Sequence, residues 1–171
     1  MYTDLGLLSY DEGECASALK ALTRELIRKN VTLATMESCT GGALASFITD
    51  TEGASAVFKG ALVAYTNLSK ELLGVPEETI DSYGVYSAET ARAMAERARR
   101  FFLADVGAGV TGSFSNPDPA NADSVPGEVY FAVADALGTE CFKCRLPFLH
   151  DRPAYKKCVS REIARQILKK L

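Results

Sequence analysis

The sequence predicts an α/β fold: a three-layer α/β/α single domain with a mixed sheet. Strand-like apolar runs alternate with helical patterns along most of the chain, and two late strand-like runs follow each other without a helix between them. The length of 171 residues suits one domain with a substantial core. We therefore expect one domain over residues 1–171, with an extension and helix over 1–30 and the core over 31–171.

The first half of the chain predicts two helices and two strands. Ser9-Tyr-Asp-Glu12 has capping-box spacing and precedes a helical pattern from Cys15 to Ile27. A β-branched run from Val31 predicts a strand, which breaks at Glu37-Ser-Cys-Thr-Gly-Gly42 into a helix that reaches about Asp50. The mixed composition that follows predicts loops over 51–59 and then a buried strand over 60–66.

The second half is predicted by turn residues and periodicity. Asn67 is a good N-cap, and Ser87 is expected to cap a long alanine-rich helix. The polar, proline-rich stretch over 112–127 predicts a long loop, and loops of that length are often functional. The other predicted elements are short helices over 68–73 and 77–82, the long helix to about 103, a strand over 106–111, a strand pair over 127–136 and 140–148, and a last helix from about Pro153.

Composition excludes several classes of protein. A net charge of −3 gives no general attraction for nucleic acid, and no apolar run approaches the ~20 residues of a membrane span. The basic residues of the long and last helices, Arg161 among them, fit solvated faces. The N-terminus lacks the pattern of a signal peptide, and an odd number of scattered cysteines, five, indicates reduced thiols in a cytoplasm. Cys141 and Cys144 lie three apart in a predicted strand, so they face opposite sides and neither a disulfide nor a shared metal is expected.

The turn after the first core strand is the first candidate for chemistry. A strand that turns abruptly into a helix leaves backbone N–H groups without intrahelical partners. Ser38 and Cys39 stand at that turn. Such a turn either binds an anion or holds a nucleophile beside an oxyanion hole, with Ser38 as a plain N-cap as the structural alternative.

Lys70 is the second candidate. Only one histidine, His150, is available for a Ser-His mechanism, and no metal-ligand spacing or dinucleotide motif occurs, so we expect no metal and no cofactor. If Asn67 caps a helix, Lys70 is its third residue, where the helix dipole disfavours the ammonium form. A neutral lysine is a general base for a serine hydroxyl, whereas a solvated helix lysine is the alternative. The pair requires Ser38 Oγ and Lys70 Nζ to lie within hydrogen-bond reach, near ~3 Å.

Several motifs, in order, closely resemble the CinA C-terminal domain family, whose stand-alone members include nicotinamide-nucleotide amidases. The resemblance covers about residues 10–171. It is carried by Glu37-Ser-Cys-Thr-Gly-Gly42, Gly60-Ala-Leu-Val-Ala-Tyr-Thr-Asn-Leu-Ser-Lys-Glu-Leu-Leu-Gly-Val75, Tyr83-Gly-Val-Tyr-Ser87, Gly109-Val-Thr-Gly112, Pro126-Gly-Glu-Val-Tyr130 and Asp151-Arg152.

The resemblance implies hydrolysis of the carboxamide of nicotinamide mononucleotide by a metal-free Ser-Lys mechanism. Ser38 is then the nucleophile and Lys70 the base, with Tyr65 orienting Lys70 or lining the pocket. Cys39 as the nucleophile is an alternative, because a thiol at a helix start gains thiolate character. The expected oxyanion donors are the N–H groups of Cys39, Thr40 and Gly41, and the expected substrate-binding residues are Thr111, Gly112 and Arg152, the last for the phosphate together with free N–H groups of its helix.

The chain departs from the family pattern after Thr111-Gly112. The family follows this pair with a glycine-rich segment, Ile-Ala-Gly-Pro-Gly-Gly, whereas Ser113-Phe-Ser-Asn-Pro-Asp-Pro-Ala120 stands here. Asp118 and Asp123 of this loop add negative charge near the expected position of a phosphate ester. Two other functions therefore stay open: an amidase for a different amide, and a non-catalytic nucleotide- or partner-binding domain. A homo-oligomer is compatible with the sequence. Larger CinA proteins carry a second, nucleotide-hydrolysing activity on an N-terminal domain, which we expect to be absent here.

Overall fold

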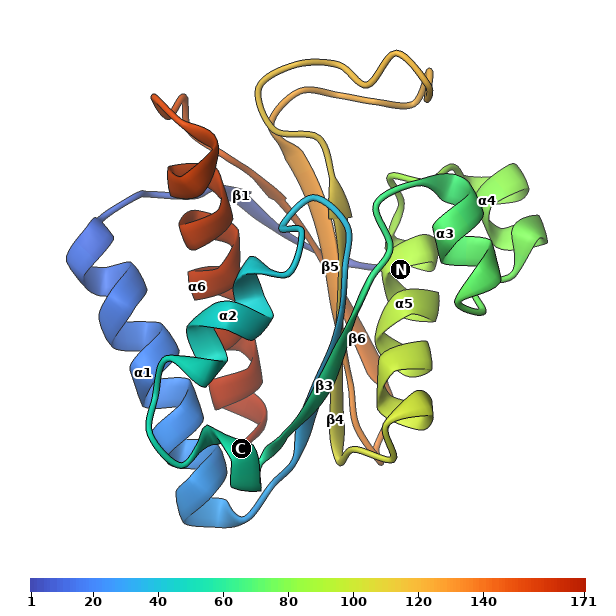
Figure 1. The fold of residues 1–171 in the computed structure, drawn as a ribbon. Helices are drawn as coiled ribbons and strands as arrows, with labels where there is room; N and C mark the ends of the chain where they lie inside the picture. Colours follow the sequence, from blue (N-terminus) through green and yellow to red (C-terminus); the bar gives the residue numbers. More distant parts are fainter.

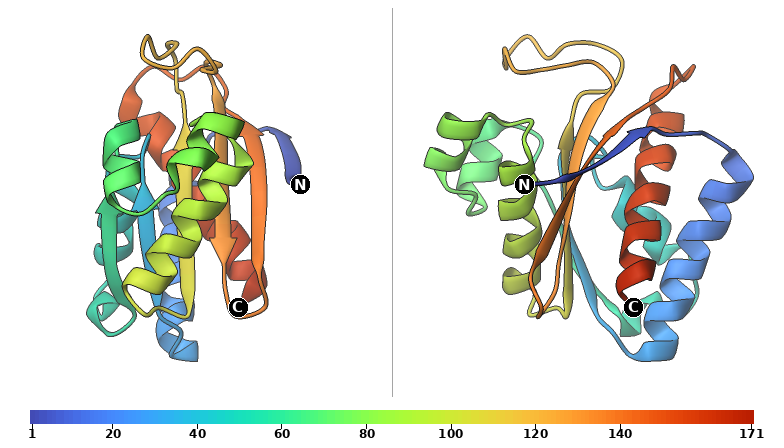
Figure 2. Two further views of the ribbon diagram at one scale, coloured as in Figure 1. Left: turned by 90° about the vertical axis from the view of Figure 1, so that its right-hand side faces the viewer. Right: turned by 180° about the vertical axis from the view of Figure 1, so that it is seen from behind.

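The computed structural model describes all 171 residues and contains one six-stranded sheet between two layers of helices (Figures 1 and 2). The strand order is β1-β6-β5-β4-β2-β3. Helices α1, α2 and α6 cover one face of the sheet, and α3, α4 and α5 lie on the other. The predicted α/β/α architecture with a mixed sheet is confirmed. None of the helices has both the length and the apolar composition of a membrane span.

Strands and helices alternate up to β3, after which three helices, three strands and a last helix follow. The strands are β1 (Thr3–Leu7), β2 (Leu33–Glu37), β3 (Phe58–Val63), β4 (Val106–Gly112), β5 (Glu128–Ala134) and β6 (Thr139–Arg145). The helices are α1 (Glu12–Lys29), α2 (Ala43–Thr49), the 3₁₀ turn η1 (Ala54–Ala56), α3 (Asn67–Leu72), α4 (Glu77–Tyr83), α5 (Ala88–Phe101) and α6 (Arg152–Lys170).

A single strand runs against the others, and this sets the position of the site. β5 is antiparallel to both of its neighbours, whereas β2 pairs in parallel with β3 and β4, and β1 pairs in parallel with β6. The carboxyl ends of β2, β3, β4 and β6 therefore share one edge of the sheet. In open α/β sheets the crevice beyond these ends is where ligands bind.

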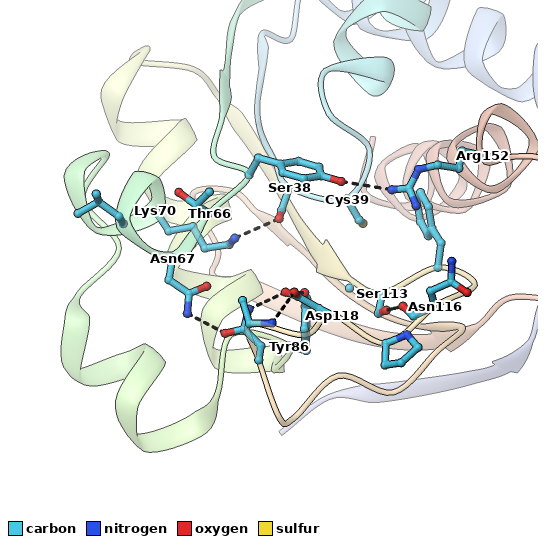
Figure 3. Close-up of a pocket in the computed structure, with 17 residues that line it drawn as sticks. Ser38, Cys39, Thr66, Asn67, Lys70, Tyr86, Ser113, Asn116, Asp118 and Arg152 are labelled. Atoms are coloured by element: carbon cyan, nitrogen blue, oxygen red, sulfur yellow. Dashed lines mark hydrogen bonds between the residues drawn. The ribbon is translucent and has the colours of Figure 1, made fainter.

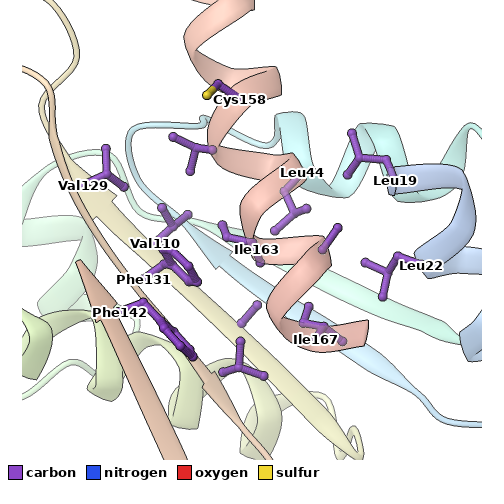
Figure 4. Packing of buried hydrophobic residues seen from close by; sticks show 14 of the residues in the cluster. Leu19, Leu22, Leu44, Val110, Val129, Phe131, Phe142, Cys158, Ile163 and Ile167 are labelled. Carbon is purple, nitrogen blue, oxygen red and sulfur yellow. The ribbon is translucent and has the colours of Figure 1, made fainter. Parts of the chain in front are cut away.

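The main hydrophobic core lies between the sheet and the α1/α2/α6 layer (Figure 4). It includes Phe131 and Phe142 of the sheet, whose rings stack at 5.0 Å, and Ile163 of α6. Cys144 belongs to this core, whereas Cys141 packs against alanines of α5 on the other face. The two thiols lie on opposite faces as predicted, and all five cysteines are free.

The opposite face is packed closely because β4 carries glycines. A Cβ added to Gly109 would lie 2.4 Å from the Ala95 nitrogen, and one added to Gly107 would lie 2.2 Å from the Ala95 carbonyl oxygen. The backbone of α5 therefore rests almost directly on β4. This contact fixes the strand from which the loop over 113–127 departs.

Three predicted boundaries in the first half were wrong. The N-terminal extension contains an edge strand, β1, whose mostly exposed residues give no apolar signal. Asp11 rather than Ser9 caps α1, since its carboxylate accepts the Glu14 N–H at 2.8 Å. Strand β3 begins at Phe58, inside the predicted loop, because its ladder with β2 already starts at Leu33.

The charge prediction for the last helix also needs a correction. Arg161 is only 1% exposed, and its guanidinium donates to the Ser9 carbonyl and contacts Glu14. It holds the start of α1 against α6 and is not part of a solvated face. The Ser87 cap and the β5–β6 strand pair are confirmed.

Candidate active site

The turn between β2 and α2 is built around the buried side chain of Glu37. Its carboxylate accepts the N–H groups of Gly42, Leu44 and Ala45 at 3.0, 3.1 and 2.8 Å. It also accepts the Thr35 hydroxyl at 3.1 Å. These three N–H groups at the start of α2 are thus satisfied from within the chain and are not available to a bound anion.

Replacing Glu37 with alanine is expected to destabilise the protein by about 2–4 kcal/mol, because three buried or half-buried N–H groups lose their acceptor. Urea unfolding measures this change. Thr35→Val is the matched control, since it removes a single hydrogen bond to the same carboxylate and should cost only about 1 kcal/mol. Equal, small effects of both substitutions would contradict the assigned role of Glu37.

Ser38 and Lys70 meet at the base of this turn (Figure 3). The Lys70 Nζ donates to Ser38 Oγ at 3.0 Å, within the reach that a nucleophile–base pair requires. Ser38 is 5% exposed and Lys70 is 1% exposed. No carboxylate lies within 4.0 Å of the Lys70 ammonium, so the serine hydroxyl is its hydrogen-bond partner. An unpaired lysine this deeply buried is costly and typical of functional sites.

The environment of Lys70 favours its neutral form. Burial lowers the pKa of Lys70 from 10.5 to about 8, against the opposing negative charge of Asp118. The predicted helix position was off by one residue, since Thr66 rather than Asn67 caps α3 in a capping box with Ser69. Lys70 is therefore the fourth residue of α3, and desolvation rather than the helix dipole is the main cause of its shift.

The backbone after Ser38 offers two free donors. The N–H groups of Cys39 and Thr40 have no hydrogen-bond partner within the chain, whereas the Gly41 N–H donates to the Ser38 carbonyl at 3.0 Å. Gly41 is therefore engaged in the turn and is not available as the third expected oxyanion donor. Burial raises the pKa of the Cys39 thiol to about 12, which opposes the thiolate that a Cys39 nucleophile requires.

A cavity of about 550 Å³ opens over the Ser38–Lys70 pair. Its walls come from the turn after β2, from residues 65–70 after β3, and from residues 112–121 after β4, with Tyr86 and Arg152 closing the remaining sides. These segments leave the sheet at the edge where the parallel strands end. His150 lies outside this cavity and is highly exposed, with its side chain 80% accessible.

Arg152 and Tyr65 form one wall of the cavity. Arg152 donates to the Tyr65 hydroxyl at 3.3 Å, and its guanidinium lies 5.2 Å from the centre of the Phe114 ring. Tyr65 makes no hydrogen bond to Lys70 or Ser38. It therefore lines the wall of the cavity and does not orient Lys70 in this structure. The cap of α6 is occupied by its own Asp151, which accepts the Ala154 N–H at 2.8 Å. Free helix N–H groups therefore add less to an anion site here than expected.

Thr111 and Gly112 were both expected to bind substrate, and the structure separates them. Gly112 lines the cavity. Thr111 is fully buried, is absent from the cavity wall, and donates its hydroxyl to the Val85 carbonyl at 2.9 Å. In this structure Thr111 ties β4 to the segment before α5, and its side chain does not line the cavity.

Comparisons with known proteins agree with the fold. The model of the family described as the CinA C-terminal domain matches residues 16–171. The chain belongs to this family.

Relatives of this CinA-domain chain include longer proteins and solved structures. A CinA-like protein of Geobacter sulfurreducens is 46% identical over 119 residues, which is 69% of this chain but 29% of that protein. The chain thus spans about three tenths of the length of such relatives. A CinA superfamily protein of Escherichia coli has a solved structure with a TM-score of 0.83, 26% identity, and coverage of 96% of this chain and 95% of that one. A competence/damage inducible protein of Agrobacterium tumefaciens aligns with a TM-score of 0.83, 27% identity, and coverage of 95% and 98%.

The segment that departs from the CinA pattern is firmly anchored. Phe114 is 3% exposed and stacks on Tyr155 at 5.3 Å, so it inserts the loop into the main core. Beyond it, Asp118 accepts the Tyr86 hydroxyl at 2.7 Å and the Asn121 amide at 2.6 Å. Asn67, the first residue of α3, donates to Asn121 at 2.8 Å.

Sequence reasoning missed the roles of Glu37, Tyr86 and Asn121. Glu37 left one signal, a charged residue at the end of an otherwise apolar strand. Tyr86 and Asn121 left none, because their contacts join residues that are more than thirty positions apart or depend on the loop's own path.

Proposed function

We propose that this CinA-domain chain is an amidohydrolase that deamidates nicotinamide mononucleotide by a Ser-Lys mechanism. The products are nicotinic acid mononucleotide and ammonia. The observation that carries the proposal is the 3.0 Å hydrogen bond between the buried Lys70 Nζ and Ser38 Oγ. A serine beside a lysine whose pKa is lowered to about 8 is an activated nucleophile beside its base.

The reaction divides into acylation and deacylation. Neutral Lys70 accepts the Ser38 proton while Ser38 Oγ attacks the amide carbon, and the resulting oxyanion is bound by the N–H groups of Cys39 and Thr40. Lys70 then passes the proton to the amide nitrogen as the C–N bond breaks, and ammonia leaves. Water, deprotonated by Lys70, attacks the ester carbon and releases the carboxylic acid together with free Ser38.

The substrate class is supported by the charge on the cavity wall. Arg152 has no carboxylate within 4.0 Å, so its guanidinium is free to bind a phosphate ester. No cofactor enters the proposed reaction. We also propose a small-molecule nucleotide as the main partner, without nucleic acid or membrane. A cytoplasmic setting suits the five free, buried cysteines.

The test is to incubate the purified protein with nicotinamide mononucleotide and measure ammonia and nicotinic acid mononucleotide together. The proposal predicts equal amounts of both products. A protein that binds the nucleotide in calorimetry but releases no ammonia would instead be a non-catalytic nucleotide-binding domain. Ammonia from other carboxamides, with none from this nucleotide, would keep the mechanism and replace the substrate.

The pH dependence follows from the pKa of Lys70. Only neutral Lys70 accepts the Ser38 proton, so kcat/KM should rise about tenfold per pH unit below pH 8 and level off above it. The profile of the free enzyme measures this pKa directly. A profile that falls through this range would indicate a different base.

A further inference from the structure

Besides Lys70, the cavity carries two ionic side chains that have no ionic partner, and they come from different elements. Arg152 stands at the start of α6, and Asp118 stands in the loop after β4 (Figure 3). No arginine or lysine nitrogen lies within 4.0 Å of the Asp118 carboxylate, and the two residues do not pair with each other. The cavity is therefore bipolar, with a cation and an anion both available to a ligand that reaches Ser38.

Asp118 is held in position by the loop and by the segment before α5. Its carboxylate accepts the Tyr86 hydroxyl, the Asn121 amide and the Ala120 N–H at 2.7, 2.6 and 2.9 Å. Its own N–H donates to Ser124 Oγ at 2.8 Å. These bonds keep the carboxylate ionised and fixed, since hydrogen bonds from Tyr86 and Asn121 hold the pKa of Asp118 below its usual range.

We propose that Asp118 is a specificity-determining residue that favours a cationic heteroaromatic ring in the amide substrate. The inference rests on the proposed function and adds a criterion for substrate choice. Nicotinamide mononucleotide is positively charged at its ring nitrogen and negatively charged at its phosphate. Its charges thus match the two unpaired groups of the cavity, with the ring cation toward Asp118 and the phosphate toward Arg152. A neutral aromatic amide gains nothing from Asp118.

A second effect of Asp118 has to be separated from this one. Its negative charge also raises the pKa of Lys70, so replacing it changes the base as well as the ring subsite. Binding to a Ser38→Ala background avoids the chemical step altogether. Losing the carboxylate makes Lys70 less positive, which by itself favours a cationic ring. The side effect therefore opposes the expected result and cannot produce it.

The experiment measures calorimetric binding of two nucleotides to Ser38→Ala protein with and without Asp118→Asn. One ligand is nicotinamide mononucleotide, and the other is benzamide riboside 5′-monophosphate, which has the same carboxamide and phosphate on a neutral ring. Asp118→Asn should weaken the cationic nucleotide by about tenfold, as expected for one charge contact in a partly solvated site, and the neutral one by less than about twofold.

Three further variants test whether the charge of Asp118 is the cause of the preference for the cationic nucleotide. Asp123→Asn removes the same charge from the same loop, but Asp123 is exposed and outside the cavity wall, so the ratio of the two affinities should stay unchanged. Tyr86→Phe removes a hydrogen bond to Asp118 and keeps its charge, so the preference for the cation should persist. Arg152→Ala should weaken both nucleotides alike, since both carry the phosphate.

The outcomes separate this inference from the proposed function. Equal weakening of both nucleotides by Asp118→Asn, or loss of the preference in Tyr86→Phe, would overturn the role of Asp118 while leaving the amidase proposal intact. Failure of both nucleotides to bind the Ser38→Ala protein would overturn the nucleotide substrate and this inference together. Selective weakening of the cationic ligand supports the inference.

Discussion

Replacing Lys70 with methionine is expected to abolish ammonia release and, at the same time, to make the protein more stable. The loss of the base should lower kcat/KM by about a thousandfold or more. The gain in stability follows from burial, because a lysine with a pKa of about 8 in the fold and near 10.5 when exposed costs about 3 kcal/mol at pH 7. Methionine fills a similar volume and carries no charge. With the hydrogen bond to Ser38 lost, a net gain of roughly 1–3 kcal/mol remains.

The pH dependence of this gain has a definite sign. The folded-state pKa lies below the unfolded one, so the folded protein binds fewer protons between pH 8 and 10.5 and its stability rises with pH in that window. The cost of Lys70 is complete below pH 8 and vanishes above 10.5. Urea unfolding at pH 7 and at pH 10 should therefore show the Met variant's advantage shrinking.

Two controls separate a base from other roles of Lys70. Lys70→Arg keeps a positive charge that is not lost in this pH range, so it should be as inactive as Lys70→Met if a neutral base is required. His150→Ala should retain most activity, since His150 is exposed and outside the cavity. Substantial activity in Lys70→Met, or its loss in His150→Ala, would revive a Ser-His mechanism.

Replacing Ser38 with alanine is expected to reduce ammonia release by about a thousandfold or more, because acylation loses its nucleophile. Cys39→Ala should stay within about tenfold of the wild type, since the buried thiol is protonated at neutral pH and only its backbone N–H takes part. Rates of ammonia release under saturating nucleotide measure both variants.

The opposite pattern would assign the reaction to the thiol. A Cys39 nucleophile predicts that Cys39→Ala is inactive and that Ser38→Cys is tolerated. The structure offers little support for that pattern, since Ser38 rather than Cys39 accepts the hydrogen bond from Lys70. Nucleotide binding to both alanine variants serves as the control for an intact cavity.

The layered fold was predictable from local patterns, and the central pair from those patterns together with the family resemblance. The β-branched run before Glu37 and the small residues after it predicted a strand-turn-helix unit. The family's motif order placed Lys70 thirty-two residues beyond Ser38. Parallel pairing of β2 with β3 then brings the ends of both strands to the same edge. The contact between Ser38 and Lys70 follows from that topology.

Other features depended on contacts that no local pattern reports. Thr111 matched the motif, yet its hydroxyl faces Val85, which comes from a distant turn. The polar composition of residues 112–127 predicted a loop, but it gave no sign that the Phe114 side chain would enter the core. Edge strand β1 pairs through its backbone, so its exposed side chains carried no periodic apolar signal.

The central claim, that Ser38 is the nucleophile, is tested most directly by trapping the acyl-enzyme. Protein mixed with nicotinamide mononucleotide is quenched in acid within the first turnover, digested with trypsin and examined by mass spectrometry of the peptide over residues 30–59. We predict an added mass equal to the nucleotide minus ammonia, located on Ser38 by fragment ions and absent from Ser38→Ala. An adduct on Cys39, or ammonia release at the wild-type rate by Ser38→Ala, would contradict the account.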